Sequence, residues 1–114
     1  MTSASQIALK GLRADQIRQT TSAHNVANQI TDGFAKQRVI QNEQISGGVQ
    51  SFVDKLDLSI EAQQISLETD GPQNNVDLTD EMVSQIETKM SYQQNAQVIR
   101  TQNQMDQTLL DTFV

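Results

Sequence analysis

The last third of the chain contains no glycine and no proline, and this restricts its fold more than any other feature. From Asp77 to Val114 the residues tolerate a helix throughout. Asp77 or Thr79 can cap its N-terminus, and Asp80 and Glu81 fall in the first turn, where the helix dipole favours anions. A helix of this extent would be roughly 50 Å long, which is typical of a coiled-coil element.

Apolar side chains in this segment follow one face of the expected helix. They recur in steps of three and four residues, and Gln94 and Gln102 occupy the gaps between them. Together with these two glutamines, the following residues form what we call the C-terminal stripe: Val83, Ile86, Met90, Val98, Met105, Leu109 and Phe113. The spacing predicts one helical face that needs a packing partner.

A second long helix is predicted at the other end of the chain, from about Ser3 to Ile30. This stretch has no proline, and its only glycine is Gly11. Its heptad-like face is weaker, because Gln16 and Gln19 interrupt the apolar members. Those members are Leu9, Leu12, Ala23, Val26 and Ile30. Small residues flank this face and would let another helix approach closely: Ala4, Ala8, Ala14 and Ala27.

The tetrapeptide Thr31-Asp32-Gly33-Phe34 ends the first helix. Gly33 suits the left-handed position just past a helix end, and Phe34 can fold back onto the last turn. We expect both helices to bury their stripes against neighbouring chains. In that packing Leu9, Leu12, Val26 and Ile30 would face Val83, Ile86, Met90, Val98, Met105 and Leu109.

Residues 35–76 give a mixed pattern. Val39 and Ile40 indicate a short extended piece, Gly47-Gly48 a turn, and residues 49–53 a strand. The stretch that begins at Leu56 alternates as a strand does, yet it would also serve as one or two helical turns. Both readings stay open as far as Pro72, which biases the residue before it away from a helix.

The chain has little apolar mass for a core. Hydrophobic residues make up 36% and aromatic residues 4%, there is no Trp, and amides are abundant, with 18 Gln and 7 Asn. A chain of 114 residues has room for one small domain. We therefore expect an elongated molecule that partner chains stabilise further.

The net charge of −6 argues against nucleic acid as a partner, because phosphate binding needs a basic face. The charge is also uneven: residues 1–50 carry five basic and three acidic side chains, whereas residues 51–114 carry three basic and eleven acidic ones. The opposite signs would favour pairing of the two ends. Each exposed ion pair is worth only ~0–1 kcal/mol, so the effect is modest.

No pattern for catalysis or cofactor binding is present. The single histidine, His24, has no acidic residue at helical spacing, so we expect it at the surface or in an interface. Capping explains the acidic residues around Asp77, and calcium loops need a longer run of oxygen ligands. Gly47-Gly48 lacks the spacing and the Lys of a phosphate loop. We therefore predict no enzyme, no metal, no cofactor and no small-molecule substrate.

The chain has no Cys, which excludes disulfides and thiolate metal sites. No apolar run exceeds three residues, so we expect no direct membrane insertion. The first five residues lack the basic region and apolar core of a cleavable signal peptide. Export, if it occurs, would use a route that does not read such a signal.

The end of the first predicted helix resembles the N-terminal signature of bacterial flagellar rod and hook proteins, approximately A-N-N-I-A-N-x-x-T-x-G-[FY]. Residues 22–34 read SAHNVANQITDGF. The matching positions are Asn25, Ala27, Asn28, Thr31, Gly33 and Phe34. The chain departs from the signature at His24, where Asn is usual, and at Asp32, where Pro is usual.

The other end is similar to the C-terminal signature of the same family. The matching positions are Asn75, Val76, Asp77 and Leu78, followed by Tyr92, Asn95 and Ala96, with further similarity at residues 81–83, 98–101 and 105–110. The resemblance covers roughly residues 3–40 and 74–112. Because both signatures stand at the appropriate ends of one chain, the pair is more specific than either motif.

The resemblance implies a helical axial protein whose terminal helices form a coiled-coil inner domain. It also implies exit through the flagellar type III export apparatus without a cleaved signal, to the periplasmic rod of the basal body. Asn25, Asn28, Tyr92 and Asn95 would make polar contacts that set register, as buried amides do in coiled coils. About 40 residues separate the two signatures, so the resemblance is to members without a large inserted domain.

The sequence thus predicts a mainly α protein in which two long terminal helices form an elongated, coiled-coil-like hairpin. Residues 1–34, 35–76 and 77–114 would form one structural domain, with a short irregular or β-containing middle. The predicted function is a structural rod subunit that associates with copies of itself and with other rod or hook proteins. The alternative is a soluble helical adaptor, or an export-associated binding protein, that does not polymerise.

Overall fold

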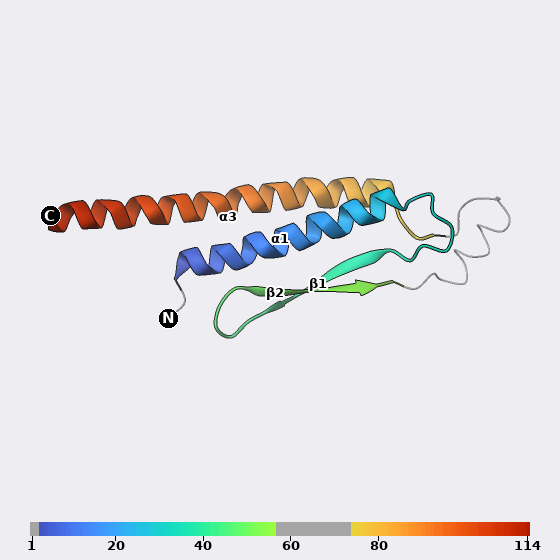
Figure 1. Ribbon diagram of the computed structural model, residues 1–114, viewed down its shortest axis with the longest axis horizontal. Helices are drawn as coiled ribbons and strands as arrows, with labels where there is room; N and C mark the ends of the chain where they lie inside the picture. The colour runs from blue at the N-terminus through green and yellow to red at the C-terminus, as the bar shows by residue number, and fades with distance from the viewer. Residues whose placement is uncertain (1–2, 57–73) are drawn as a thin grey trace.

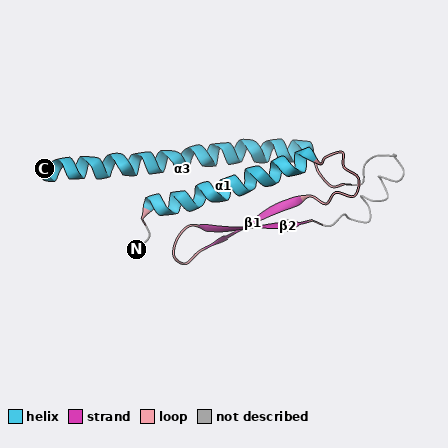
Figure 2. Cartoon of the chain, in the orientation of Figure 1, coloured by secondary structure: helices cyan, strands magenta, loops and turns pink. Residues whose placement is uncertain are grey.

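The computed structural model describes residues 3–56 and 74–114. Its elements, in chain order, are α1 (Ala4–Ala27), β1 (Gln37–Glu43), β2 (Val49–Lys55) and α3 (Leu78–Phe113). Figure 1 shows three layers, in which α1 runs antiparallel to α3 and the β1–β2 hairpin covers another side of α1. The molecule is elongated, with extents of 73 × 25 × 14 Å. The predicted fold class is confirmed: two long terminal helices enclose a short β-containing middle (Figure 2).

Helix α1 has a defined start and an earlier end than the sequence predicts. Ser3 forms a capping box with Gln6, in which each side chain bonds to the other residue's backbone N–H. The helix ends at Ala27 instead of continuing to Ile30. The Asn28 amide donates to the His24 carbonyl (2.9 Å), and such local side-chain bonds compete with further helical turns.

The segment after α1 has two of the predicted features, although the helix ends at Ala27, before the tetrapeptide at residues 31–34 that was expected to stop it. Gly33 has a φ of +74°, the left-handed conformation that a residue without Cβ adopts at no steric cost. Phe34 returns to the last turn of α1, where its ring meets the His24 ring edge-on at a centroid distance of 5.5 Å. His24 itself is exposed.

Helix α3 is 36 residues long and is capped by Asp77. The Asp77 carboxylate accepts from the backbone N–H of Thr79 at 2.9 Å and of Asp80 at 3.4 Å. Of the two predicted caps, Asp77 is therefore the one used. Neither α1 nor α3 has the length and apolarity needed to cross a membrane, and the described residues contain no other helix.

The predicted extended pieces form an antiparallel hairpin that runs from Gln37 paired with Lys55 to Glu43 paired with Val49. Gly47 and Gly48 make its turn with φ values of +90° and +85°. On the outer face Ile40 stands opposite Phe52, and both side chains are exposed. The two readings of the stretch beyond Leu56 concern residues that lie outside those described.

Candidate assembly surfaces

The two helices meet through small and polar side chains. On α1 the meeting residues include Gly11, Asp15, Ser22 and Asn25, and on α3 they include Glu81, Ser91 and Asn95; we call this contact the α1–α3 seam. A Cβ placed on Gly11 would lie 2.7 Å from Nδ2 of Asn95, so the helices approach closely there. Within the described residues, the only buried hydrophobic side chains are Ala8 and Ala14. The described part of one chain therefore has almost no apolar core.

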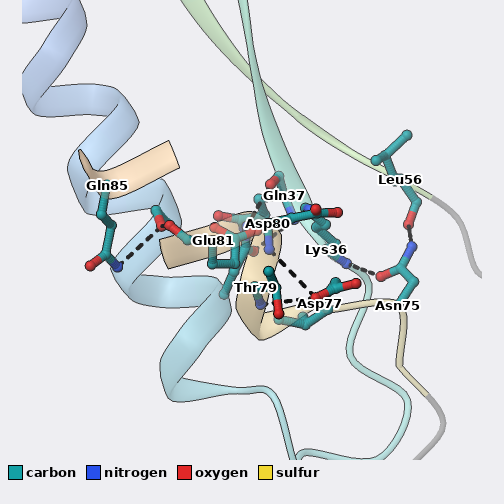
Figure 3. Close-up of polar contacts among 12 residues, drawn as sticks. Lys36, Gln37, Leu56, Asn75, Asp77, Thr79, Asp80, Glu81 and Gln85 are labelled. Atoms are coloured by element: carbon teal, nitrogen blue, oxygen red, sulfur yellow. Dashed lines mark hydrogen bonds and ion pairs between the residues drawn. The ribbon is translucent and has the colours of Figure 1, made fainter. Parts of the chain in front are cut away.

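Asn25 joins three elements at the most buried point of the described chain. It is 1% exposed. Its Oδ1 accepts from the backbone N–H of Gln37 at 2.9 Å, and its Nδ2 donates to the carbonyl of Gln37 at 2.7 Å and to Oε1 of Glu81 at 3.1 Å. The same carboxylate oxygen lies 3.0 Å from Nζ of Lys36, near the start of β1 (Figure 3). We call Asn25, Lys36, Gln37 and Glu81 the Asn25 cluster.

The segment before α3 holds the base of the hairpin. Oδ1 of Asn75 accepts from the backbone N–H of Lys36 at 2.6 Å, and its Nδ2 donates to the carbonyl of Leu56 at 3.1 Å (Figure 3). Asn74 donates to the carbonyls of Gln29 (2.5 Å) and Thr31 (3.3 Å) in the turn after α1. Two consecutive asparagines thus tie the start of α3 to both neighbouring segments.

The middle of the seam is organised by a buried acid, Asp15, which is 3% exposed. Its Oδ2 accepts from Oγ of Ser91 at 2.9 Å and from Nδ2 of Asn95 at 3.3 Å, and Nη1 of Arg18 lies 3.9 Å from its other oxygen. Tyr92, between the two α3 partners, is 42% exposed. Asn95 and Tyr92 therefore differ in environment although both belong to the same motif.

The other motif residues have local or surface positions. Asn28 caps the end of α1 and accepts from Thr31 at 3.2 Å. Val76 is half-buried and Leu78 is 43% exposed at the start of α3. Ala27 is exposed and Ala96 is half-buried. The proposed register role of Asn25, Asn28, Tyr92 and Asn95 between chains stays a prediction.

The large apolar residues expected at the interface do not pack between α1 and α3 of one chain. On α1, Leu12 and Val26 are half-buried and Leu9 is exposed, and Ile30, in the turn after α1, is exposed as well. On α3 every apolar residue of the C-terminal stripe is exposed: Val83, Ile86, Met90, Val98, Met105, Leu109 and Phe113. The small side chains of the seam fix the rotation of each helix. This rotation keeps Val83, Ile86 and Met90 off the α1-facing side, whereas Leu109 and Phe113 are exposed because they lie beyond the start of α1. Burial of these side chains against other chains stays a prediction.

Helix α3 extends well beyond the start of α1 (Figure 1). Along its α1-facing side the residues are buried or half-buried as far as Gln102: Glu81, Ser84, Thr88, Ser91, Asn95, Ile99 and Gln102. The same steps of three and four continue to Asp106, Leu109 and Phe113, which are exposed. We call residues 103–113 the α3 overhang. Because the capping box fixes where α1 begins, nothing in the described part of the chain covers it.

Sequence reasoning missed several residues that matter in the seam. Asp15, Ser22, Glu81 and Gln85 are polar, and periodicity searches assign polar residues to the solvent side. The available signal was the small-residue spacing around Ala8 and Ala14, together with polar residues that could satisfy one another. No cluster of three or more His, Cys, Asp or Glu side chains that could hold a metal occurs among the described residues.

Comparison with known proteins gives one family match. Residues 73–112 match the family described as flagellar basal body rod FlgEFG protein C-terminal. The matched segment comprises the Asn74–Asn75 tie, the Asp77 cap and nearly all of α3, and it includes the Tyr92, Asn95 and Ala96 motif. No curated protein matches the chain. The family is one of structural flagellar proteins, so the match indicates an axial structural role in the flagellar basal body. The match at residues 73–112 supports placing the chain in the flagellar rod and hook family, which its two terminal signatures resemble.

Proposed function

We propose that this chain is a subunit of the bacterial flagellar basal-body rod that associates with copies of itself and with neighbouring rod or hook proteins through its terminal helices. The observation that carries this proposal is the exposed C-terminal stripe on α3, the helix that lies within the family match. Export through the flagellar type III apparatus, without a cleaved signal, is part of the same proposal and rests on the family resemblance.

The energetics of a single chain support association. Among residues 3–56 and 74–114 the two buried hydrophobic side chains are alanines, whereas the stripe leaves Ile86 at 59%, Met105 at 61% and Phe113 at 82% exposure. Full burial of a side chain of this size is worth about 1.5–3 kcal/mol. For the part of the chain that the structure describes, contacts between chains therefore offer far more apolar burial than packing within one chain.

The polar seam supplies the rigid part of such a subunit. Hydrogen bonds among Asp15, Ser91 and Asn95, and those of the Asn25 cluster, set the rotation of α1 against α3. That rotation presents the stripe outward along most of a 36-residue helix. In the proposed rod, neighbouring chains bury this surface while the seam stays within each chain.

Co-sedimentation with purified rod and hook proteins tests the proposal. We expect the wild-type chain to pellet with them, and we expect Met105→Asp to weaken this association at least about tenfold, which corresponds to 1.4 kcal/mol or more. Gln104→Asp is the matched control, since it adds the same charge one residue away and off the stripe. A wild-type chain that remains monomeric at every concentration, alone and with rod partners, would support the non-polymerising adaptor instead.

A further inference from the structure

The C-terminal stripe has the same chemical order in both directions from Val98. A glutamine lies four residues from Val98 on each side. The next member of the stripe in each direction is a methionine, and the member after it is an aliphatic residue. Val83 and Phe113 end the series at equal distances from Val98. In full, the matched positions are Gln94 with Gln102, Met90 with Met105, Ile86 with Leu109, and Val83 with Phe113. A stripe of this kind is complementary to itself when one copy is reversed.

We propose that two copies of this chain form an antiparallel dimer through α3, with the two-fold axis at Val98. In this arrangement Val98 meets Val98, and each Met90 meets the partner's Met105. The overhang of each chain then covers the first half of the other chain's stripe, where Ile86 is 59% exposed. Such a contact is isologous, because the same patch is used on both subunits.

The fold leaves this surface accessible. Val83, Ile86, Met90 and Val98 are between 44% and 59% exposed, whereas the α1-facing residues of the same stretch of α3 are buried or half-buried. The hairpin packs against α1, so it does not stand over the stripe. The stripe advances by slightly more than the ~3.6 residues of each helical turn, which predicts a right-handed wrap of the paired helices.

A parallel, in-register pair would use the stripe less well. It would place acidic side chains that flank the stripe level with their own copies, Glu87 with Glu87 and Asp106 with Asp106. The antiparallel register separates these like charges along the helices. In the antiparallel register, the α3 overhang of one chain packs on the part of the partner's α3 that α1 supports. In the parallel register, the two overhangs would contact only each other.

An isologous contact closes on itself and does not propagate. The dimer buries the C-terminal stripe, so it competes with the binding of rod and hook proteins to the same stripe. This part of the inference rests on the proposed rod function. The dimer is then a closed form of the subunit, and assembly requires the two chains to separate.

Cysteine cross-linking tests the register directly, because the chain has no cysteine of its own. We expect Val98→Cys to form a disulfide-linked dimer under mild oxidation at least about tenfold faster than Arg100→Cys, since only close Cβ atoms can be bridged. Arg100 is the matched control because it is exposed, two residues away, and on the far side of α3.

The direction of pairing needs a second measurement. We expect Met90→Cys and Met105→Cys to cross-link weakly alone and strongly when the two variants are mixed. Strong self-linking of each variant with no gain on mixing would overturn the antiparallel register. A Val98→Cys rate no greater than that of Arg100→Cys would overturn the dimer.

The competition is tested with the oxidised Val98→Cys dimer. We expect it to be excluded from pellets with rod and hook proteins and to enter them after reduction. If the oxidised and reduced forms pelleted equally, the proposed competition between the dimer and rod association would be wrong. If neither form pelleted while the cross-linking pattern held, the rod function would fail and the dimer would stand. If the reduced protein pelleted but the expected cross-links did not form, the dimer would be excluded and the rod function would stand.

Discussion

The side-chain amide of Asn25 pairs with the backbone of Gln37 through two hydrogen bonds, one to the N–H at 2.9 Å and one to the carbonyl at 2.7 Å. An amide group carries the same donor and acceptor as a peptide bond, so Asn25 completes the edge of β1 as a neighbouring strand would. Its second amide hydrogen reaches Glu81 on α3. One side chain from α1 thus satisfies groups on two of the elements that pack against it, β1 and α3.

We predict that Asn25→Ala destabilises the chain by about 2–3 kcal/mol, because it leaves the backbone N–H and carbonyl of Gln37 without their side-chain partner and removes one of the two groups that contact Oε1 of Glu81. Asn25→Asp removes the donor and sets a charge beside Glu81, so it should cost at least as much. Urea unfolding followed by circular dichroism measures both. Asn42→Ala, at an exposed position on β1, serves as the control and should change the unfolding free energy by less than about 0.5 kcal/mol. Equal effects at the two sites would contradict this role for Asn25.

The Lys36–Glu81 ion pair should show strong coupling. The Glu81 side chain is 4% exposed and that of Lys36 is 20% exposed, so removal of the lysine leaves a nearly buried carboxylate uncompensated. We expect Lys36→Met to cost about 3 kcal/mol, and we expect addition of Glu81→Gln to recover part of that loss. A double-mutant cycle from denaturant unfolding gives the coupling. Additive effects would show that the two side chains act independently.

Gly11→Ala should have different effects on stability in two backgrounds. Alanine is favoured over glycine inside a helix by about 1 kcal/mol, but here its Cβ would lie 2.7 Å from Nδ2 of Asn95. Asn95 would have to move away and lose its bond to Asp15. In the wild-type chain we therefore expect no gain in stability. In an Asn95→Ala background, we expect the same change to stabilise by about 0.5–1 kcal/mol. Thermal unfolding of the wild type, the two single variants and the double variant measures these effects. A gain in stability in both backgrounds would contradict the close approach of the helices at Gly11.

Phe113→Ala should separate chain stability from association. At 82% exposure in the overhang, the ring contributes little to folding, and we expect a change below about 0.5 kcal/mol in unfolding of the dilute chain. Removal of the same ring should weaken contacts between chains by about 1–3 kcal/mol if it becomes buried there. Sedimentation equilibrium over a concentration series measures the second quantity. A large loss of stability in dilute solution would place Phe113 in an internal contact instead.

The two helices, the Asp77 cap and the two extended pieces on either side of Gly47-Gly48 were predictable because each depends on local signals. The absence of glycine and proline after residue 73, the Asp77 cap, and the paired glycines at 47 and 48 act over a few residues. The left-handed conformation of Gly33 was equally local. The helix end at Ala27 was missed because it depends on the Asn28 side chain bonding to the His24 carbonyl.

The rotation of the two helices was not predictable from periodicity. Such patterns assume that large apolar side chains mark the buried face of a helix. Here Gly11 allows close approach, and Asp15, Ser22 and Asn25 are buried because their partners on α3 and β1 satisfy their hydrogen bonds. Those partners lie 12 to 80 residues away in sequence, so no local window contains the signal.

The hairpin is tied to the rest of the molecule at both of its ends. At the turn, Nζ of Lys10 donates to Oε1 of Gln44 and to the carbonyl of Gly47, both at 3.0 Å. At the base, Asn25 and Asn75 hold the backbone of Gln37, Lys36 and Leu56. With both ends fixed, the hairpin cannot swivel about a single hinge. The hairpin therefore stiffens α1 along its length. A twist or pull applied to α3 is resisted by α1 and the hairpin together.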